Sequence, residues 1–204
     1  MKPKVKSAYY GDASYDTRER FVSYWHQINE IMKLKPQSVL EVGVGSKFLS
    51  NYLKSKNVNV LTLDNNGELK PDILGSVLCM PFSPGSFDVV ACCEVLEHLP
   101  YEEFQRALSE LYRVSCGYVI ISLPDTNRVY RFNIQVPKLG ELRLLIPLPR
   151  IGKPKFDEQH YWEIDANNYC LNRILSDIRT IGFYVKRTYR VFEYPYHRFF
   201  ILHK

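Results

Sequence analysis

Short runs of apolar residues alternate along the chain with segments in which apolar residues recur every three or four positions. Such runs are typical of buried strands, and the periodic segments are typical of amphipathic helices. The predicted strands are residues 39–42, 58–63, 73–77, 87–93 and 118–123. Strands that alternate with helices predict an α/β fold with a doubly wound, mostly parallel sheet. Two last apolar segments flank the turn 194–197 and predict a closing antiparallel hairpin, which brings the sheet to seven strands.

The periodic segments predict four helices. They cover about residues 17–34, 48–53, 101–114 and 165–181. Asp16 or Thr17 is expected to cap the first helix and Asp165 the last, and Gly182 is expected to end the last one. The apolar positions of the first helix, which we expect to face the sheet, are Phe21, Tyr24, Trp25, Ile28, Ile31 and Met32.

The first predicted strand ends in a turn with two glycines, Gly43 and Gly45. Glycines at a first crossover let a ligand approach the backbone, and the next helix offers free N–H groups. A dinucleotide fingerprint would need a small residue at Phe48, and a phosphate loop would need a Gly-Lys-Ser/Thr ending, so neither motif is present. Glu41 favours a positively charged ligand over a pyrophosphate. An ordinary tight turn between strand and helix is the structural alternative.

An acidic residue ends the second predicted strand. Asp64 lies at the expected edge for a carboxylate that accepts hydrogen bonds from ribose hydroxyls. The sequence Asp-Asn-Asn-Gly is also strong turn chemistry, so a solvated turn aspartate is the alternative. Next to the glycine turn, the ribose role is favoured.

Composition places few limits on function. The 204 residues are 46% hydrophobic and 24% charged, with a formal net charge of +5, as expected for one soluble domain and not by itself an argument for nucleic acid. The five cysteines form no Cys-x-x-Cys pair, so we expect reduced core residues in a cytoplasmic protein and no metal site. No signal peptide or transmembrane segment is expected.

Several blocks in the middle of the chain resemble, in order and spacing, those of the class I S-adenosylmethionine-dependent methyltransferases. They are the acidic-x-Gly-x-Gly turn of residues 41–45, Met80-Pro81-Phe82, 86–90, Glu94-Val95-Leu96-Glu97-His98-Leu99, 111–114 and 119–124. The resemblance covers residues 37–124 strongly and the remainder loosely. It implies a Rossmann-like methyltransferase fold and S-adenosyl-L-methionine as cofactor.

The resemblance also implies which residues meet the cofactor. Ser76 and Val77 would flank the adenine, and Cys93 and Glu94 would lie near the methionine part. The predicted cofactor-binding residues are Glu41, Gly43, Val44, Gly45, Ser46, Asp64, Asn65, Ser76, Val77, Cys93 and Glu94. Two positions depart from the family pattern: Lys47 replaces a third glycine, and Ser76 replaces an aspartate. Both departures bear on cofactor affinity more than on fold.

Residues 125–160 form a predicted insertion after the fifth strand. The segment is basic, alternates apolar residues from Tyr130 to Val136, and is apolar again from Leu139 to Pro149. An insertion here is expected to lie over the active face as an acceptor lid. Its apolar content would pack on substrate, a second subunit or a lipid surface. We predict one domain over 1–204, with residues 1–35 as an N-terminal arm and helix that close over the cofactor.

The predicted function is methyl transfer to a small-molecule acceptor. A base is needed only if the acceptor must lose a proton. His98 and His160 are the candidate catalytic residues, although His98 could instead brace the next helix. Glu94 and Tyr161 are further possible bases. The alternative function is a catalytically degenerate module that binds nucleic acid or protein through the basic, aromatic tail 184–198.

Overall fold

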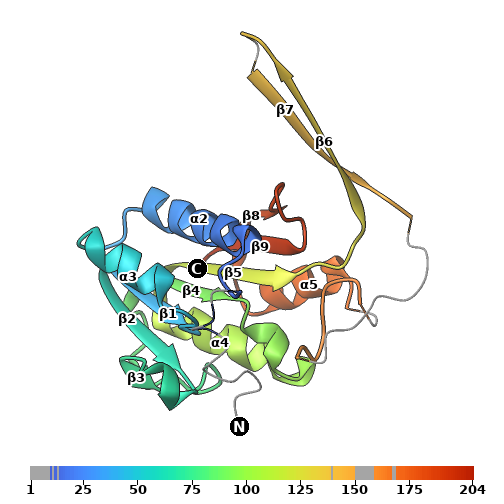
Figure 1. The fold of residues 1–204 in the computed structure, drawn as a ribbon. Helices are drawn as coiled ribbons and strands as arrows, with labels where there is room; N and C mark the ends of the chain where they lie inside the picture. The colour runs from blue at the N-terminus through green and yellow to red at the C-terminus, as the bar shows by residue number, and fades with distance from the viewer. Residues whose placement is uncertain (1–9, 11, 13, 139, 150–158, 167–168) are drawn as a thin grey trace.

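The computed structural model describes residues 10, 12, 14–138, 140–149, 159–166 and 169–204. Its main element is a seven-stranded sheet with the order β3-β2-β1-β4-β5-β9-β8 (Figure 1). The strands are β1 (Ser38–Val42), β2 (Asn59–Asp64), β3 (Ile73–Leu74), β4 (Phe87–Cys93), β5 (Ser115–Pro124), β8 (Tyr184–Arg190) and β9 (His197–His203). The first five pair in parallel, whereas β9 is antiparallel to β5 and β8. The predicted doubly wound sheet with a closing hairpin is confirmed.

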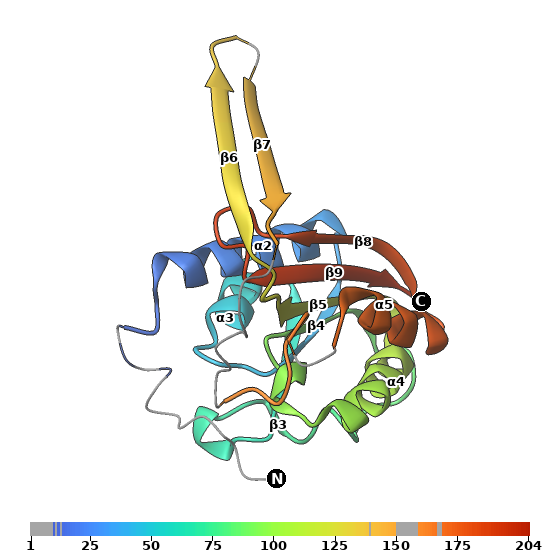
Figure 2. The ribbon, with the colours of Figure 1, turned by 90° about the vertical axis from the view of Figure 1, so that its right-hand side faces the viewer.

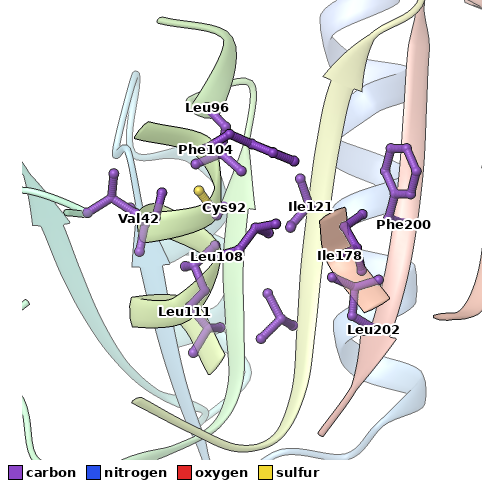
Figure 3. Packing of buried hydrophobic residues seen from close by; sticks show 14 of the residues in the cluster. Val42, Cys92, Leu96, Phe104, Leu108, Leu111, Ile121, Ile178, Phe200 and Leu202 are labelled. Carbon is purple, nitrogen blue, oxygen red and sulfur yellow. The ribbon is translucent and has the colours of Figure 1, made fainter. Parts of the chain in front are cut away.

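Two pairs of helices cover the faces of the sheet. The helices are α2 (Arg18–Lys33), α3 (Phe48–Ser55), α4 (Phe104–Val114) and α5 (Leu171–Thr180). Neighbouring residues of a strand point to opposite faces. Accordingly Val89 joins the core beneath α2 and α3, while Val90 joins the core beneath α4 and α5. Figure 3 shows this second core, where Leu108 and Leu111 of α4 meet Ile121 of β5.

Helix α2 begins as predicted and buries only part of the predicted face: Tyr24 and Ile31 are buried, as expected. Thr17 is the N-cap and accepts a hydrogen bond from the Arg20 N–H. Trp25 and Phe21, both expected to face the sheet, are 59% and 46% exposed. The buried residues are Ser23, Tyr24, Gln27, Glu30 and Ile31. Polar residues are tolerated there because α2 also meets polar groups of the edge strand β8: Glu30 forms an ion pair with Arg187.

Three further predictions need correction. Asp165 does not cap the last helix: α5 begins at Leu171 with Cys170 as its N-cap, and Asp165 adopts a left-handed φ of 59° within the preceding loop. Strand β3 has two residues because residues 76–79 turn back in an isolated bridge. The five cysteines are free, but only Cys92 is buried in the core; Cys93 is partly buried beside it, and Cys79, Cys116 and Cys170 are exposed.

The insertion contains a hairpin that stands away from the main sheet. Strands β6 (Val129–Val136) and β7 (Gly140–Pro147) pair only with each other and project outward in both views (Figures 1 and 2). Directly opposed residues lie on one face of a hairpin. One face therefore presents Tyr130, Phe132, Ile134, Leu142, Leu144 and Ile146, all of which are exposed. Within the described parts of the chain, no helix is long and apolar enough to cross a membrane.

Candidate functional site

A cavity of about 400 Å³ opens at the carboxyl ends of the parallel strands. The ends of β1, β2 and β4 supply its floor, as expected for the ligand-binding edge of a doubly wound sheet. Of the predicted cofactor-binding residues, those that line it are Glu41, Gly43, Val44, Gly45, Asp64, Asn65, Ser76, Val77, Cys93 and Glu94. Both candidate catalytic residues, His98 and His160, line the same cavity.

The glycine turn has the close packing that its sequence implies. Gly43 has a φ of +82°, and a Cβ at this position would lie 2.3 Å from Cγ2 of Val95. Its N–H donates to the Leu63 carbonyl at 2.9 Å, which joins the turn to β2. Lys47, which replaces the family's third glycine, has a φ of 62°, a conformation that glycine adopts more readily. Its Nζ reaches away to the Lys70 carbonyl at 2.6 Å, so the ammonium group is bonded at the far side of the turn.

Glu41 is a buried carboxylate at the centre of this edge. Its side chain is 6% exposed, and Oε2 has no hydrogen-bond partner among the described residues. Burial raises the pKa of Glu41 to about 8, because the ionised form loses its hydration. A carboxyl in this position favours a cationic ligand, since the ligand would supply the partner that the protein does not.

The end of β2 is shaped by Asp64. Its Oδ2 accepts a hydrogen bond from the Val44 N–H at 2.9 Å, and its Oδ1 accepts one from the Asn66 N–H at 2.8 Å. The carboxylate thus connects the glycine turn to the next loop. The turn role and the ligand role are compatible, because each carboxylate oxygen can accept more than one hydrogen bond.

Two predicted residues lie less directly in the cavity. Ser76 lines it, yet its Oγ accepts a bond from the Leu78 N–H at 3.2 Å. Ser46 is absent from the cavity wall formed by the described residues; its Oγ lies 2.8 Å from the Tyr24 hydroxyl on α2. The position of Ser46 ties the glycine turn to the N-terminal helix.

Glu94 follows β4 in a left-handed conformation, with a φ of 54°. Its Oε1 accepts a bond from the Ser122 hydroxyl at 2.7 Å, and its Oε2 lies 3.5 Å from Nε2 of His197. The neighbouring Cys93 is also in the wall, where burial raises the pKa of its thiol and keeps it protonated. These contacts hold the Glu94 carboxylate in place beside the cavity.

The two candidate catalytic histidines meet beside a buried acid. Their rings are 4.9 Å apart between centroids, although one follows β4 and the other precedes α5. Nδ1 of His98 lies 3.1 Å from the Gln159 carbonyl oxygen, and Nδ1 of His160 lies 2.7 Å from Oε1 of Glu163. His98 therefore contacts the segment around Gln159, and the alternative that it braces the next helix stays a prediction.

Glu97 lies beside this pair and is fully buried. Neither carboxylate oxygen has a hydrogen-bond partner among the described residues. Loss of hydration on burial raises its pKa well above the usual range. The sequence placed Glu97 in one of the blocks that resemble the methyltransferase family but gave no sign that His160 would join it, because their contact depends on the loop before α5.

The wall of the cavity also contains residues that were not predicted from the sequence to be part of a site. Arg20, Tyr24 and Gln27 come from α2, and Tyr194, Tyr196 and His197 come from the turn between β8 and β9. By contrast, the N-terminal arm was expected to close over the cofactor through its tyrosines Tyr9, Tyr10 and Tyr15. Tyr10 and Tyr15 line the cavity, whereas Tyr9 lies outside the described residues. The described hairpin residues do not line the cavity, although Gln159 and His160 of the insertion do; a lid role for the insertion stays a prediction.

Comparisons with known proteins agree with this geometry. The model of a family described as "Methyltransferase domain" matches residues 40–121. A Burkholderia thailandensis 1,6-didemethyltoxoflavin-N1-methyltransferase, solved with bound 1,6-didemethyltoxoflavin and S-adenosylhomocysteine, has a TM-score of 0.61 and 13% identity, covering 97% of this chain and 84% of its own. A SAM-dependent methyltransferase from Aquifex aeolicus has a TM-score of 0.63 and 15% identity, covering 98% of each chain.

A third structure, an S-adenosylmethionine-dependent methyltransferase from Clostridium acetobutylicum ATCC 824, has a TM-score of 0.63 and 10% identity, covering 96% of each chain. At such identities the likeness concerns the fold. No curated protein sequence matches this chain.

Proposed function

We propose that this protein, whose residues 40–121 belong to the class I S-adenosylmethionine-dependent methyltransferase family, transfers a methyl group to a small-molecule acceptor. The methyl donor is S-adenosylmethionine. The observation that carries the proposal is the buried Glu41 carboxyl, with Oε2 lacking a partner among the described residues, beside the glycine turn. The cofactor has a sulfonium and an ammonium group, so its charge suits that carboxyl.

Three parts of the cavity would hold the cofactor. The turn at Gly43 and Gly45 lets the ligand come close to the backbone, and Asp64 would accept hydrogen bonds from the ribose hydroxyls. Ser76 and Val77 would lie beside the adenine. Cys93 and Glu94 would lie beside the methionine part, where the protonated thiol adds no charge of its own.

S-adenosylmethionine supplies a methyl group that is already activated, because its sulfur leaves as a neutral thioether. The remaining task of the protein is to hold the acceptor in line with that methyl group and to exclude water. Tyr194, Tyr196 and Tyr161 also line the cavity and would form the acceptor wall. His98 and His160 stay candidate catalytic residues on the same side.

The test is a change in thermal stability on ligand addition. S-adenosylmethionine and its demethylated product should each raise the unfolding temperature, since a ligand at 100 times its Kd adds about 2.7 kcal/mol of stability. NAD and ATP should not. Asp64→Asn should lose most of the shift. Asp88→Asn is the matched control, because Asp88, like Asp64, accepts two hydrogen bonds from backbone N–H groups. Asp88 lies near the start of β4, at the end of the strand away from the cavity.

The outcomes separate the alternatives. A shift with NAD, or equal shifts in Asp64→Asn and the unmodified protein, would overturn the cofactor assignment. A shift with neither cofactor nor product would favour the second candidate, a binding module without catalysis. The observation in favour of that candidate is the exposed apolar face of the β6–β7 hairpin. The basic tail supports it less, because Arg187 is paired with Glu30 and Lys186 lies over the Tyr118 ring.

A further inference from the structure

We propose that Glu97, His98 and His160 form a binding site for a divalent transition-metal ion within the acceptor side of the cavity. One ligand atom from each side chain lies within 4.8 Å of the other two. Ligand atoms at about 2.1 Å from one ion are roughly 3.3–4.2 Å apart, so a pair at the 4.8 Å limit needs to approach by roughly 0.6–1.5 Å.

Both histidines already have the ring orientation that a metal ligand needs. A backbone carbonyl can only accept, so Nδ1 of His98 must donate its hydrogen to Gln159. In the same way Nδ1 of His160 donates to the Glu163 carboxylate. In each neutral ring the lone pair therefore sits on Nε2. Metal-bound histidines are commonly held by such a hydrogen bond to a carbonyl or carboxylate.

The Glu163 carboxylate, which accepts the hydrogen bond from His160, is itself held in place. Glu163 is 1% exposed, and its Oε1 also accepts a hydrogen bond from the Tyr196 hydroxyl at 2.6 Å. The carboxylate behind His160 is thus fixed by a residue from a different part of the chain. A rigid carboxylate–histidine pair orients the ligand nitrogen and increases its basicity.

Glu97 gives an independent indication of a ligand. Its side chain is fully buried, it lines the cavity, and both oxygens are without partners among the described residues. Buried polar groups are normally hydrogen-bonded, and burial of a carboxylate without a partner is costly. A cation between Glu97 and the two imidazoles would supply the missing partner to an oxygen of this side chain.

The donor set indicates which ions would bind. Two imidazole nitrogens and one carboxylate oxygen suit Zn²⁺, Mn²⁺, Fe²⁺ or Co²⁺, whereas Mg²⁺ and Ca²⁺ prefer sites made of oxygen. Three protein ligands leave at least one coordination position for another molecule, which is the pattern of catalytic sites. Here the ligands line the cavity, so the open position would be available to the acceptor.

If the protein is a methyltransferase, as proposed above, this metal site indicates an acceptor with a hydroxyl group. Coordination of that oxygen lowers its pKa, and its proton passes to solvent. The acceptor oxygen then attacks the methyl carbon: the C–O bond forms as the C–S bond breaks, and the electron pair of that bond stays on sulfur. As metal ligands, His98 and His160 would act on the acceptor through the ion and would not take up its proton.

Metal binding can be tested without knowledge of the acceptor. The full-length protein, stripped with EDTA, is titrated with Co²⁺, and binding is followed by visible absorption and calorimetry. We expect one ion per chain and no thiolate charge-transfer band, since none of the three ligands is a cysteine. Mg²⁺ should bind at least tenfold more weakly. Glu97→Gln and His160→Gln should each weaken Co²⁺ binding by tenfold or more.

The control variant is His203→Gln, because His203 packs on Tyr118 at the far end of β9 and should leave Co²⁺ affinity unchanged. Because Glu97 is buried, circular dichroism is used to check that Glu97→Gln folds. If Glu97→Gln does not fold, the result rests on His160→Gln alone. Absence of saturable binding, or equal Co²⁺ affinity in His160→Gln and the unmodified protein, overturns the metal site.

The same preparations separate this inference from the proposed function. The thermal shift with S-adenosylhomocysteine is measured on the stripped protein, with and without Co²⁺. A shift with the nucleoside but no Co²⁺ binding removes the metal site and leaves the methyltransferase proposal intact. Co²⁺ binding without a thermal shift on S-adenosylhomocysteine would support the metal site and contradict the methyltransferase proposal. The inference of a hydroxyl acceptor would then be lost as well.

Discussion

Glu41→Gln should make the free protein more stable, although it alters the proposed cofactor site. Glu41 is 6% exposed and burial raises its pKa to about 8, compared with an ordinary value of 4.5. Between these pH values the folded state keeps a proton that the unfolded state has released. The contribution of Glu41 to stability is therefore fully present below pH 4.5 and is lost as the pH rises towards 8.

The size of the effect follows from this interval. Each pH unit within it lowers the free energy of unfolding by about 1.4 kcal/mol, so the loss at pH 7 is roughly 3 kcal/mol. Gln has almost the same shape and cannot ionise, so Glu41→Gln should recover most of that loss. For a chain of this size, 1 kcal/mol corresponds to about 2–4 °C, so the unfolding temperature at pH 7 should rise by roughly 6–12 °C.

Urea unfolding at pH 5, 6, 7 and 8 is the assay. The gain from Glu41→Gln should be small at pH 5 and increase up to pH 8. Glu102→Gln is the control, because Glu102 is exposed and should show no such pH-dependent gain. A Glu41→Gln protein that is no more stable at pH 7, or whose gain does not change with pH, would refute the reasoning. Binding of S-adenosylmethionine should weaken in the same variant, because Gln, unlike Glu41, cannot ionise to pair with the cationic groups of the ligand.

Three further predictions concern packing and charge. Gly43→Ala should cost roughly 2–4 kcal/mol in urea unfolding, from the positive φ and the 2.3 Å approach to Val95, and adding Val95→Ala should restore the steric part but not the strain. Asp125→Ala should lower the free energy of unfolding in urea by about 3–5 kcal/mol, since it leaves the guanidinium of Arg198, 2.7 Å from Asp125, without this carboxylate. Asp125→Asn should lower it by less. Brief alkylation of the native protein, followed by mass spectrometry, should modify the exposed cysteines and spare Cys92 until urea is added; the exposed ones are Cys79, Cys116 and Cys170.

The strands were the most predictable part of the fold. The run from Phe87 to Cys93 lies in a parallel sheet covered on both faces, so its nearly continuous apolar pattern, interrupted only by Asp88, marks both ends of β4. The first helix was less predictable. Apolar spacing favoured Trp25, whereas α2 packs partly against polar groups of β8, and the pairing of Glu30 with Arg187 allows a charged residue on the buried face. Asp165 was misjudged because loop residues also use aspartate.

The sequence by itself determined the cofactor half of the cavity, since the glycine turn, Glu41 and Asp64 each lie at the end of a predictable strand and parallel strands end at one edge. Only the tertiary structure decided the acceptor half. There Glu97 meets His160, and α2 and the β8–β9 turn supply side chains to the opposite wall. These contacts join segments distant in sequence through loops, whose path depends on the packing of the whole chain and leaves no periodic pattern to read.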